Sequence, residues 1–162
     1  MSLSKKIVLL GHFGVGKTSL VRQFVDSVFS ENYLVTLGVH VKKKDVEILG
    51  KKVTLIIWDI EGSTSISKAR KSYLAGSHGF LYVFDVTRPE TFESLEKEME
   101  FLEESYPATP VCRIGNKSDL IVSENDREFF DSEKFAKCDF TSAKNGENVE
   151  HVFLKISEFI TS

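Results

Sequence analysis

Residues 11–19 read GHFGVGKTS, and this stretch decides the fold because it matches the phosphate-binding pattern G-x-x-x-x-G-K-[ST]. Its glycines permit a loop whose backbone N–H groups point inward at phosphate oxygens. The apolar run KKIVLL (Lys5–Leu10) precedes it, and helical apolar spacing follows from Lys17 to about Ser27. The start of that helix adds its dipole and free N–H groups. The stretch therefore predicts a nucleotide phosphate site, in which Lys17 neutralises the β and γ phosphates and the Thr18 hydroxyl binds Mg²⁺.

The rest of the chain alternates between strand and helix patterns. Strands are predicted at Lys5–Leu10, Val39–Ile48, Lys52–Asp59, Gly79–Asp85, Val111–Asn116 and Cys138–Thr141, with helices at Lys17–Ser27, Pro89–Tyr106, Phe129–Phe135 and Val149–Ile160. A hairpin turn is expected at Gly50-Lys51. The acidic run from Glu93 to Glu104 is interpreted as the solvated face of its helix. Strands separated by helices predict right-handed crossovers and a mostly parallel sheet, covered on both faces.

Composition limits the class of protein. A chain of 162 residues, 41% apolar and 28% charged, fits one soluble globular domain, here residues 1–162. A net charge of −3 argues against nucleic acid or a membrane as a partner, since both attract basic surfaces. Two cysteines without metal-site spacing favour a reducing, cytoplasmic location. No prenylation cysteine ends the chain, so we expect no membrane anchor in it, and membrane association only through a partner or a removed tail.

Two further motifs point to the base. IGNKSDL (114–120) follows one predicted buried strand, and FTSAKNG (140–146) follows the next. The carboxylate of Asp119 can accept hydrogen bonds from both N1–H and the 2-amino group of guanine. Adenine offers an acceptor at N1 and has no 2-amino group, so the carboxylate would be left unpaired. Together with the phosphate loop, the two motifs predict a guanine nucleotide.

Neighbouring residues complete the predicted base site. Lys117 can lay its stem over the base, Asn116 can brace the loop, and the Ala143 N–H can meet O6 of guanine. The full set of predicted nucleotide-binding residues is Phe13, Gly14, Val15, Gly16, Lys17, Thr18, Ser19, Phe29, Asn116, Lys117, Asp119, Leu120, Ser142, Ala143 and Lys144.

At this point the chain resembles the Ras-superfamily small GTPases, and the Rab branch more than Ras itself. ENYLVTLGV (31–39) is like the Rab switch I with its T-x-G, and residues 58–62 match WD-x-x-G. SYLAGSHGFLYVFDVTRPETF (72–92) is similar to the corresponding Rab segment. The likeness runs from about Lys5 to Ile160. It implies an α/β fold: a P-loop G domain with a mostly parallel six-stranded sheet, one antiparallel strand, and helices on both faces.

The resemblance also implies functional residues and partners. Thr36 would close over Mg²⁺ and the γ-phosphate, Asp59 would hold Mg²⁺ through water, and Phe29 would support the base edge-on. Two switch regions, Ser30–Val39 and roughly Asp59–Ser77, would change order with the γ-phosphate and bind effector proteins, an exchange factor and a GTPase-activating protein. We expect a monomeric switch that cycles between GTP and GDP. The implied metal ligands are Thr18, Thr36 and Asp59.

Three residues depart from the family pattern. Ser63 stands where the family has the glutamine that orients the attacking water, and losing that amide could cost on the order of 10²–10³ in rate. Glu61 replaces a small residue beside the γ-phosphate, and Phe13 replaces another where an incoming arginine finger must pass. Hydrolysis is therefore expected to be slow. The residues expected to carry it are Lys17, Thr36, Glu61, Gly62 and Ser63.

Three interpretations of Glu61 remain open from the sequence. Its side chain turns into solvent, or holds the attacking water in place of glutamine, or disfavours the triphosphate and locks the switch in one state. The functional alternatives are a hydrolysis-deficient nucleotide-binding interaction module and, more remotely, a phosphotransferase or ATPase on a P-loop fold. Asp119 and Ala143 argue against the last of these.

Overall fold

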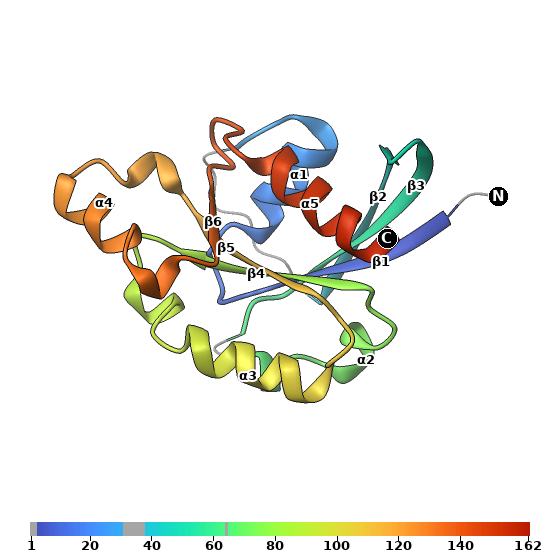
Figure 1. The fold of residues 1–162 in the computed structure, drawn as a ribbon, viewed down its shortest axis with the longest axis horizontal. Helices are drawn as coiled ribbons and strands as arrows, with labels where there is room; N and C mark the ends of the chain where they lie inside the picture. Colours follow the sequence, from blue (N-terminus) through green and yellow to red (C-terminus); the bar gives the residue numbers. More distant parts are fainter. Residues whose placement is uncertain (1–2, 31–37, 64) are drawn as a thin grey trace.

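The computed structural model describes residues 3–30, 38–63 and 65–162 (Figure 1). Thr36 and most of the first switch region lie outside the described residues. Within the described chain, six strands form one sheet in the order β2-β3-β1-β4-β5-β6. The strands are β1 Leu3–Leu10, β2 Val39–Ile48, β3 Lys51–Ile60, β4 Gly79–Asp85, β5 Val111–Asn116 and β6 Cys138–Thr141.

The helices are α1 Lys17–Asp26, α2 Lys71–Leu74, α3 Leu95–Ser105, α4 Glu124–Phe130 and α5 Val149–Thr161. Short 3-10 turns occur at η1 Ile66–Lys68, η2 Pro89–Thr91, η3 Ser118–Leu120 and η4 Glu133–Phe135. Of the described strands, β2 pairs antiparallel to β3, and the other pairings are parallel. The predicted α/β architecture, with one antiparallel strand, is confirmed.

Two apolar clusters fill the space on the two faces of the sheet. α1 and α5 cover one face, where Phe24 and Phe153 stack with their ring centroids 4.2 Å apart. α2 and α3 cover the other face (Figure 1). There Phe92 packs edge-on to Phe84 and Phe130, at 5.5 and 5.7 Å. Each such aromatic pair contributes about 0.5–1.5 kcal/mol beyond burial. These two layers hold the carboxyl ends of the parallel strands in fixed positions.

Two predicted helices differ from the observed ones. The segment Pro89–Tyr106 is divided, because the chain leaves helical geometry at Phe92 (φ −133°) and turns that ring into the aromatic cluster. The segment Phe129–Phe135 is wrong as a helix: α4 begins earlier, after Ser123, whose hydroxyl accepts from the Asp126 N–H. It ends at Phe130, and a separate 3-10 turn follows. Packing of the phenylalanines, and not helical periodicity, explains their spacing.

The hairpin turn also lies one residue earlier than predicted. Ile48 pairs with Lys51, so Leu49 and Gly50 form the two-residue loop, with φ of 52° and 77°. Positive φ at both positions matches the twist of a two-residue hairpin.

One glutamate of the acidic run is not solvated. Glu98 on α3 is 6% exposed, and its carboxylate accepts a hydrogen bond from the Ile66 N–H at 3.0 Å. The interpretation of the whole run as a solvated face is therefore wrong at this position.

Candidate functional site

The phosphate-binding loop lies between β1 and α1, at the carboxyl edge of the sheet. Its last glycine, Gly16, has φ 103° and caps the N-terminus of α1. A Cβ there would lie 2.2 Å from the Asn116 side-chain nitrogen. Only glycine combines that backbone geometry with so close a neighbour. The loop is thus packed directly against the residue that organises the base side of the site.

The lysine of this loop is buried, and its ammonium is hydrogen-bonded to backbone carbonyls. The Lys17 ammonium donates to the carbonyls of Gly11 and His12, each at 3.0 Å. Burial lowers the pKa of Lys17 to about 8, and the Asp59 carboxylate opposes that effect. A buried ammonium of this kind favours an anionic ligand, because bound phosphate oxygens would replace the carbonyls as stronger, charged acceptors.

The predicted metal ligands that the structure describes lie together. The Thr18 hydroxyl donates to Asp59 Oδ2 at 2.6 Å, joining the first turn of α1 to the end of β3. The parallel register pairs Leu9 with Asp59, which puts this carboxylate beside the phosphate loop. The described residues hold no group of three or more His, Cys, Asp or Glu side chains that could bind a metal ion by themselves. A hydroxyl and one carboxylate fit Mg²⁺, which keeps waters and takes phosphate oxygens as further ligands.

On the base side, Asn116 connects three segments of the chain. Its side-chain nitrogen donates to the Val15 carbonyl at 3.0 Å. Its oxygen accepts from the Thr141 hydroxyl at 3.0 Å and from the Ala143 N–H at 3.3 Å. The side chain is fully buried among these partners. The bracing role predicted for Asn116 is therefore matched by contacts to the phosphate loop, to β6 and to the loop after it.

Lys117 and Asp119 follow β5 and are both oriented by neighbours. The Lys117 ammonium pairs with Asp85 at 2.7 Å and donates to the Gly14 carbonyl at 3.2 Å. The Ser142 hydroxyl donates to the Asp119 carboxylate at 2.8 Å. Sequence reasoning missed Asp85, although an acid that ends a fully buried strand was an available indication.

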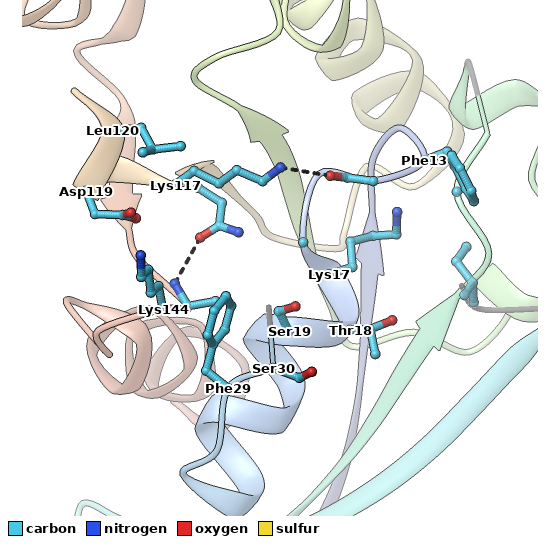
Figure 2. Close-up of a pocket in the computed structure, with 16 residues that line it drawn as sticks. Phe13, Lys17, Thr18, Ser19, Phe29, Ser30, Lys117, Asp119, Leu120 and Lys144 are labelled. Atoms are coloured by element: carbon cyan, nitrogen blue, oxygen red, sulfur yellow. Dashed lines mark hydrogen bonds between the residues drawn. The ribbon is translucent and has the colours of Figure 1, made fainter. Parts of the chain in front are cut away.

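These residues surround a cavity of about 320 Å³, here called the nucleotide cavity. Figure 2 shows Asp119 and Lys144 at one end and Phe13 at the other, with Lys117 between them. Every predicted nucleotide-binding residue lines it except Val15 and Ser142, which are fully buried behind the wall. Ser30 and Ile60 line the cavity without having been predicted as nucleotide-binding.

Comparison with known proteins decides the family. The sequence pattern of the Ras family matches residues 6–162. The chain belongs to the Ras family. The Ras-related protein Rab-12 of Homo sapiens is 36% identical to this Ras-family chain over 165 residues, covering 96% of the chain and 66% of Rab-12. The GTP-binding protein ypt1 of Schizosaccharomyces pombe is 37% identical over 162 residues, covering 96% of the chain and 79% of ypt1.

These relatives confirm the predicted place near the Rab branch. The chain spans about two thirds (66%) of the length of Rab-12, whether human or from Mus musculus. Across the described ranges of this Ras-family chain, no helix has the length and apolar character needed to cross a membrane.

The second switch region of this Ras-family chain touches the phosphate loop through Gly62. A Cβ on Gly62 would lie 2.4 Å from both the N and Cα atoms of Phe13. The two backbones are therefore in direct contact, and Gly62 lines the nucleotide cavity. This close approach puts part of the second switch region at the wall of the nucleotide cavity.

Glu61 and Ser63, on either side of Gly62, are bonded to parts of the chain outside the nucleotide cavity. The Glu61 carboxylate accepts from the Gly38 N–H at 3.3 Å, and the Glu61 N–H donates to the Gly38 carbonyl at 2.8 Å. The Ser63 hydroxyl donates to the Ser65 carbonyl at 2.8 Å. Neither Glu61 nor Ser63 lines the nucleotide cavity; both line a much smaller one of about 10 Å³. Glu61 is exposed.

Phe13 forms the outer rim of the nucleotide cavity with half of its surface exposed (50%). Its backbone carbonyl accepts from the Arg88 guanidinium at 2.8 Å. Arg88 was not predicted, because it lies after β4 and reaches the loop only through the folded chain. The phosphate loop that carries the Phe13 ring is therefore held by a hydrogen bond from the Arg88 side chain.

Proposed function

We propose that this chain is a guanine-nucleotide switch: a monomeric small GTPase, a single domain of residues 1–162, that binds GTP and GDP and hydrolyses GTP slowly. The observation that carries the proposal is the convergence of the phosphate loop and the Asn116–Asp119 segment on one cavity. Family membership supports it, as does the similarity to ypt1, which is a GTP-binding protein.

In this proposal each end of the nucleotide has its own residues. Asp119 recognises the guanine edge, with Ser142 holding its carboxylate in place. Lys17 exchanges two carbonyl acceptors for phosphate oxygens. Thr18 and Asp59 hold Mg²⁺, and a bound Mg²⁺ would neutralise charge that develops on the phosphates. Thr36 would add a further ligand, from outside the described residues.

Slow hydrolysis follows from what Ser63 and Glu61 do. The Ser63 hydroxyl donates to the Ser65 carbonyl, and the serine side chain is too short to replace the amide of glutamine. The Glu61 carboxylate accepts from the N–H of Gly38, the residue just before β2. Without a group that orients water, we expect a rate about 10²–10³ below that of a relative with glutamine.

The two switch regions, Ser30–Val39 and Asp59–Ser77, are proposed to bind effectors, an exchange factor and a GTPase-activating protein. The protein is proposed to be cytoplasmic, with no nucleic-acid partner, and to reach membranes through a partner or a tail outside this sequence.

Nucleotide competition and single-turnover hydrolysis test the proposal. GTP and GDP should displace a fluorescent guanine nucleotide, and ATP should not. Protein loaded with GTP should then release phosphate over minutes to hours, while Lys17→Met, which loses the ammonium that holds the phosphates, should neither load nor release. Equal competition by ATP would contradict the base assignment. Stable GTP over many hours would favour the alternative of a nucleotide-binding interaction module without turnover.

A further inference from the structure

A buried carboxylate stands out on the helix that faces the second switch region. α3 carries several glutamates, and Glu96 and Glu100 on either side of Glu98 are exposed. Glu98 is 6% exposed. Removing a carboxylate from water is unfavourable unless hydrogen bonds replace those lost to water. The Glu98 carboxylate therefore needs a hydrogen-bond donor that offsets the cost of its burial.

That partner is the backbone of the second switch region. The Ile66 N–H donates to Glu98 Oε2 at 3.0 Å, and the bond is buried. Ile66 begins η1, and its side chain, 5% exposed, packs in the same apolar cluster as Leu95 and Met99 of α3. Burial, and then the charge of the Glu98 carboxylate, raise the pKa of Tyr82 on β4. Ile66 is thus fixed by its backbone and by its side chain.

The start of the same segment is fixed to the phosphate loop. Gly62 lies in backbone contact with Phe13. Four residue steps separate Gly62 from Ile66, so the chain between them spans at most about 14 Å. Within this span the Ser63 hydroxyl is bonded to the Ser65 carbonyl. Only this short span separates the contact of Gly62 with the phosphate loop from the bond of Ile66 to α3.

We propose that Glu98 is a positioning residue, whose carboxylate fixes Ile66 on α3 and thereby keeps Gly62 and Ser63 in place against the phosphate loop. Glu98 itself lies outside the nucleotide cavity. Its effect on hydrolysis rests on the function proposed above, whereas its effect on the switch backbone does not. This role lies outside the phosphate loop and the base motifs, because it gives α3 a part in positioning the second switch region.

The experiment compares Glu98→Leu and Glu98→Gln with the matched changes at exposed Glu100 of the same helix. Leucine removes the acceptor but keeps a side chain that suits a buried site. Glutamine loses the charge but keeps an oxygen that can accept from Ile66. Three quantities are measured on each GDP- or GTP-loaded protein: hydrogen exchange at the amides of residues 62, 63 and 66, single-turnover hydrolysis, and GDP release.

In Glu98→Leu we expect about tenfold faster exchange at Ile66, the factor that corresponds to one lost hydrogen bond. Exchange at Gly62 and Ser63 should also rise, and hydrolysis should fall about tenfold, because small misplacements near the reacting atoms are costly. GDP release should stay within about twofold, since Glu98 does not touch the cavity. Glu98→Gln should restore both exchange and hydrolysis to within about threefold, and the Glu100 variants should match the unaltered protein.

Several results would overturn the proposal. Unchanged exchange at Ile66 in Glu98→Leu would remove the bond on which it rests. Faster exchange at Ile66 with Gly62, Ser63 and hydrolysis unchanged would show a purely structural contact. A glutamine variant as impaired as leucine would rule out the acceptor as the cause.

Failure of the proposed function gives a different pattern. If the unaltered protein does not hydrolyse GTP, exchange at Gly62 and Ser63 alone decides whether Glu98 positions the switch. If Glu98→Leu does not fold, Glu98→Asp replaces it. Its carboxylate keeps the charge but is one methylene too short to reach Ile66, and it should show the same faster exchange.

Discussion

The contact between Gly62 and the phosphate loop makes a sharp prediction for Gly62→Ala. The new methyl carbon would lie 2.4 Å from the N and Cα atoms of Phe13 and 2.8 Å from the carbonyl carbon of His12. All three are backbone atoms, which cannot turn away as the end of a side chain could. Ordinary contact begins at 3.4 Å, so the switch must withdraw from the loop by 1.0 Å, the difference between 3.4 and 2.4 Å.

A displacement of this size has a large expected effect on the chemical step. A misplacement of about 1 Å, even one caused by a mutation away from the reacting atoms, can reduce a rate by about 10². Single-turnover hydrolysis of preloaded GTP in Gly62→Ala should therefore fall about 10²-fold. Binding of GDP should stay within a few fold, because the base and the first phosphates are held by other residues.

A glycine in open surroundings provides the control. Gly50 in the hairpin turn has φ 77° and nothing within 4 Å of an added Cβ. Gly50→Ala should lower the free energy of unfolding by about 1 kcal/mol and leave hydrolysis unchanged. Equal hydrolysis by Gly62→Ala and the unaltered protein would refute the reasoning, since it would mean that the switch does not rest on the loop during the reaction.

Three further changes test other parts of the site. Asp119→Asn should weaken GDP binding at least about 10²-fold and improve binding of xanthosine diphosphate, whose second carbonyl meets the new amide donor; unchanged GDP affinity in competition assays would contradict the base assignment. Ser63→Gln should raise single-turnover hydrolysis by about 10², and a rate that stays low would exclude water positioning as the main defect. Asp85→Asn removes the buried charge that pairs with half-exposed Lys117, and should weaken GDP binding about tenfold by calorimetry; equal affinities would mean that the pair does not order the base site.

The buried parallel strands were the most predictable part of the fold. β4 and β5 have the predicted bounds, Gly79–Asp85 and Val111–Asn116. A strand covered on both faces is a continuous apolar run, ended by the residues that form the binding edge. The short elements of the second switch were not predictable in this way, since α2 has four residues and shows no periodicity.

In the site, residues carried by local motifs were found, and residues that arrive through tertiary contacts were missed. The phosphate loop and Asp119 are defined by spacing along the chain. Asp85 and Arg88 contact partners far away in sequence, and so does Glu98, which lies outside the nucleotide cavity and among exposed glutamates in the sequence. Charge patterning records which residues are polar, whereas burial is decided by the neighbouring segment.

The three-way bonding of Asn116 has a consequence for the whole ligand. One amide is bonded both to the phosphate loop, through Val15, and to the base loop, through Ala143. The two halves of the cavity are thus joined through one side chain, so in the proposed function both ends of a bound nucleotide would be held by one connected unit. Once either end of the ligand is seated, the other end is presented to its partners at high effective concentration. A change that loosens one loop would therefore weaken the contacts to both the phosphates and the base.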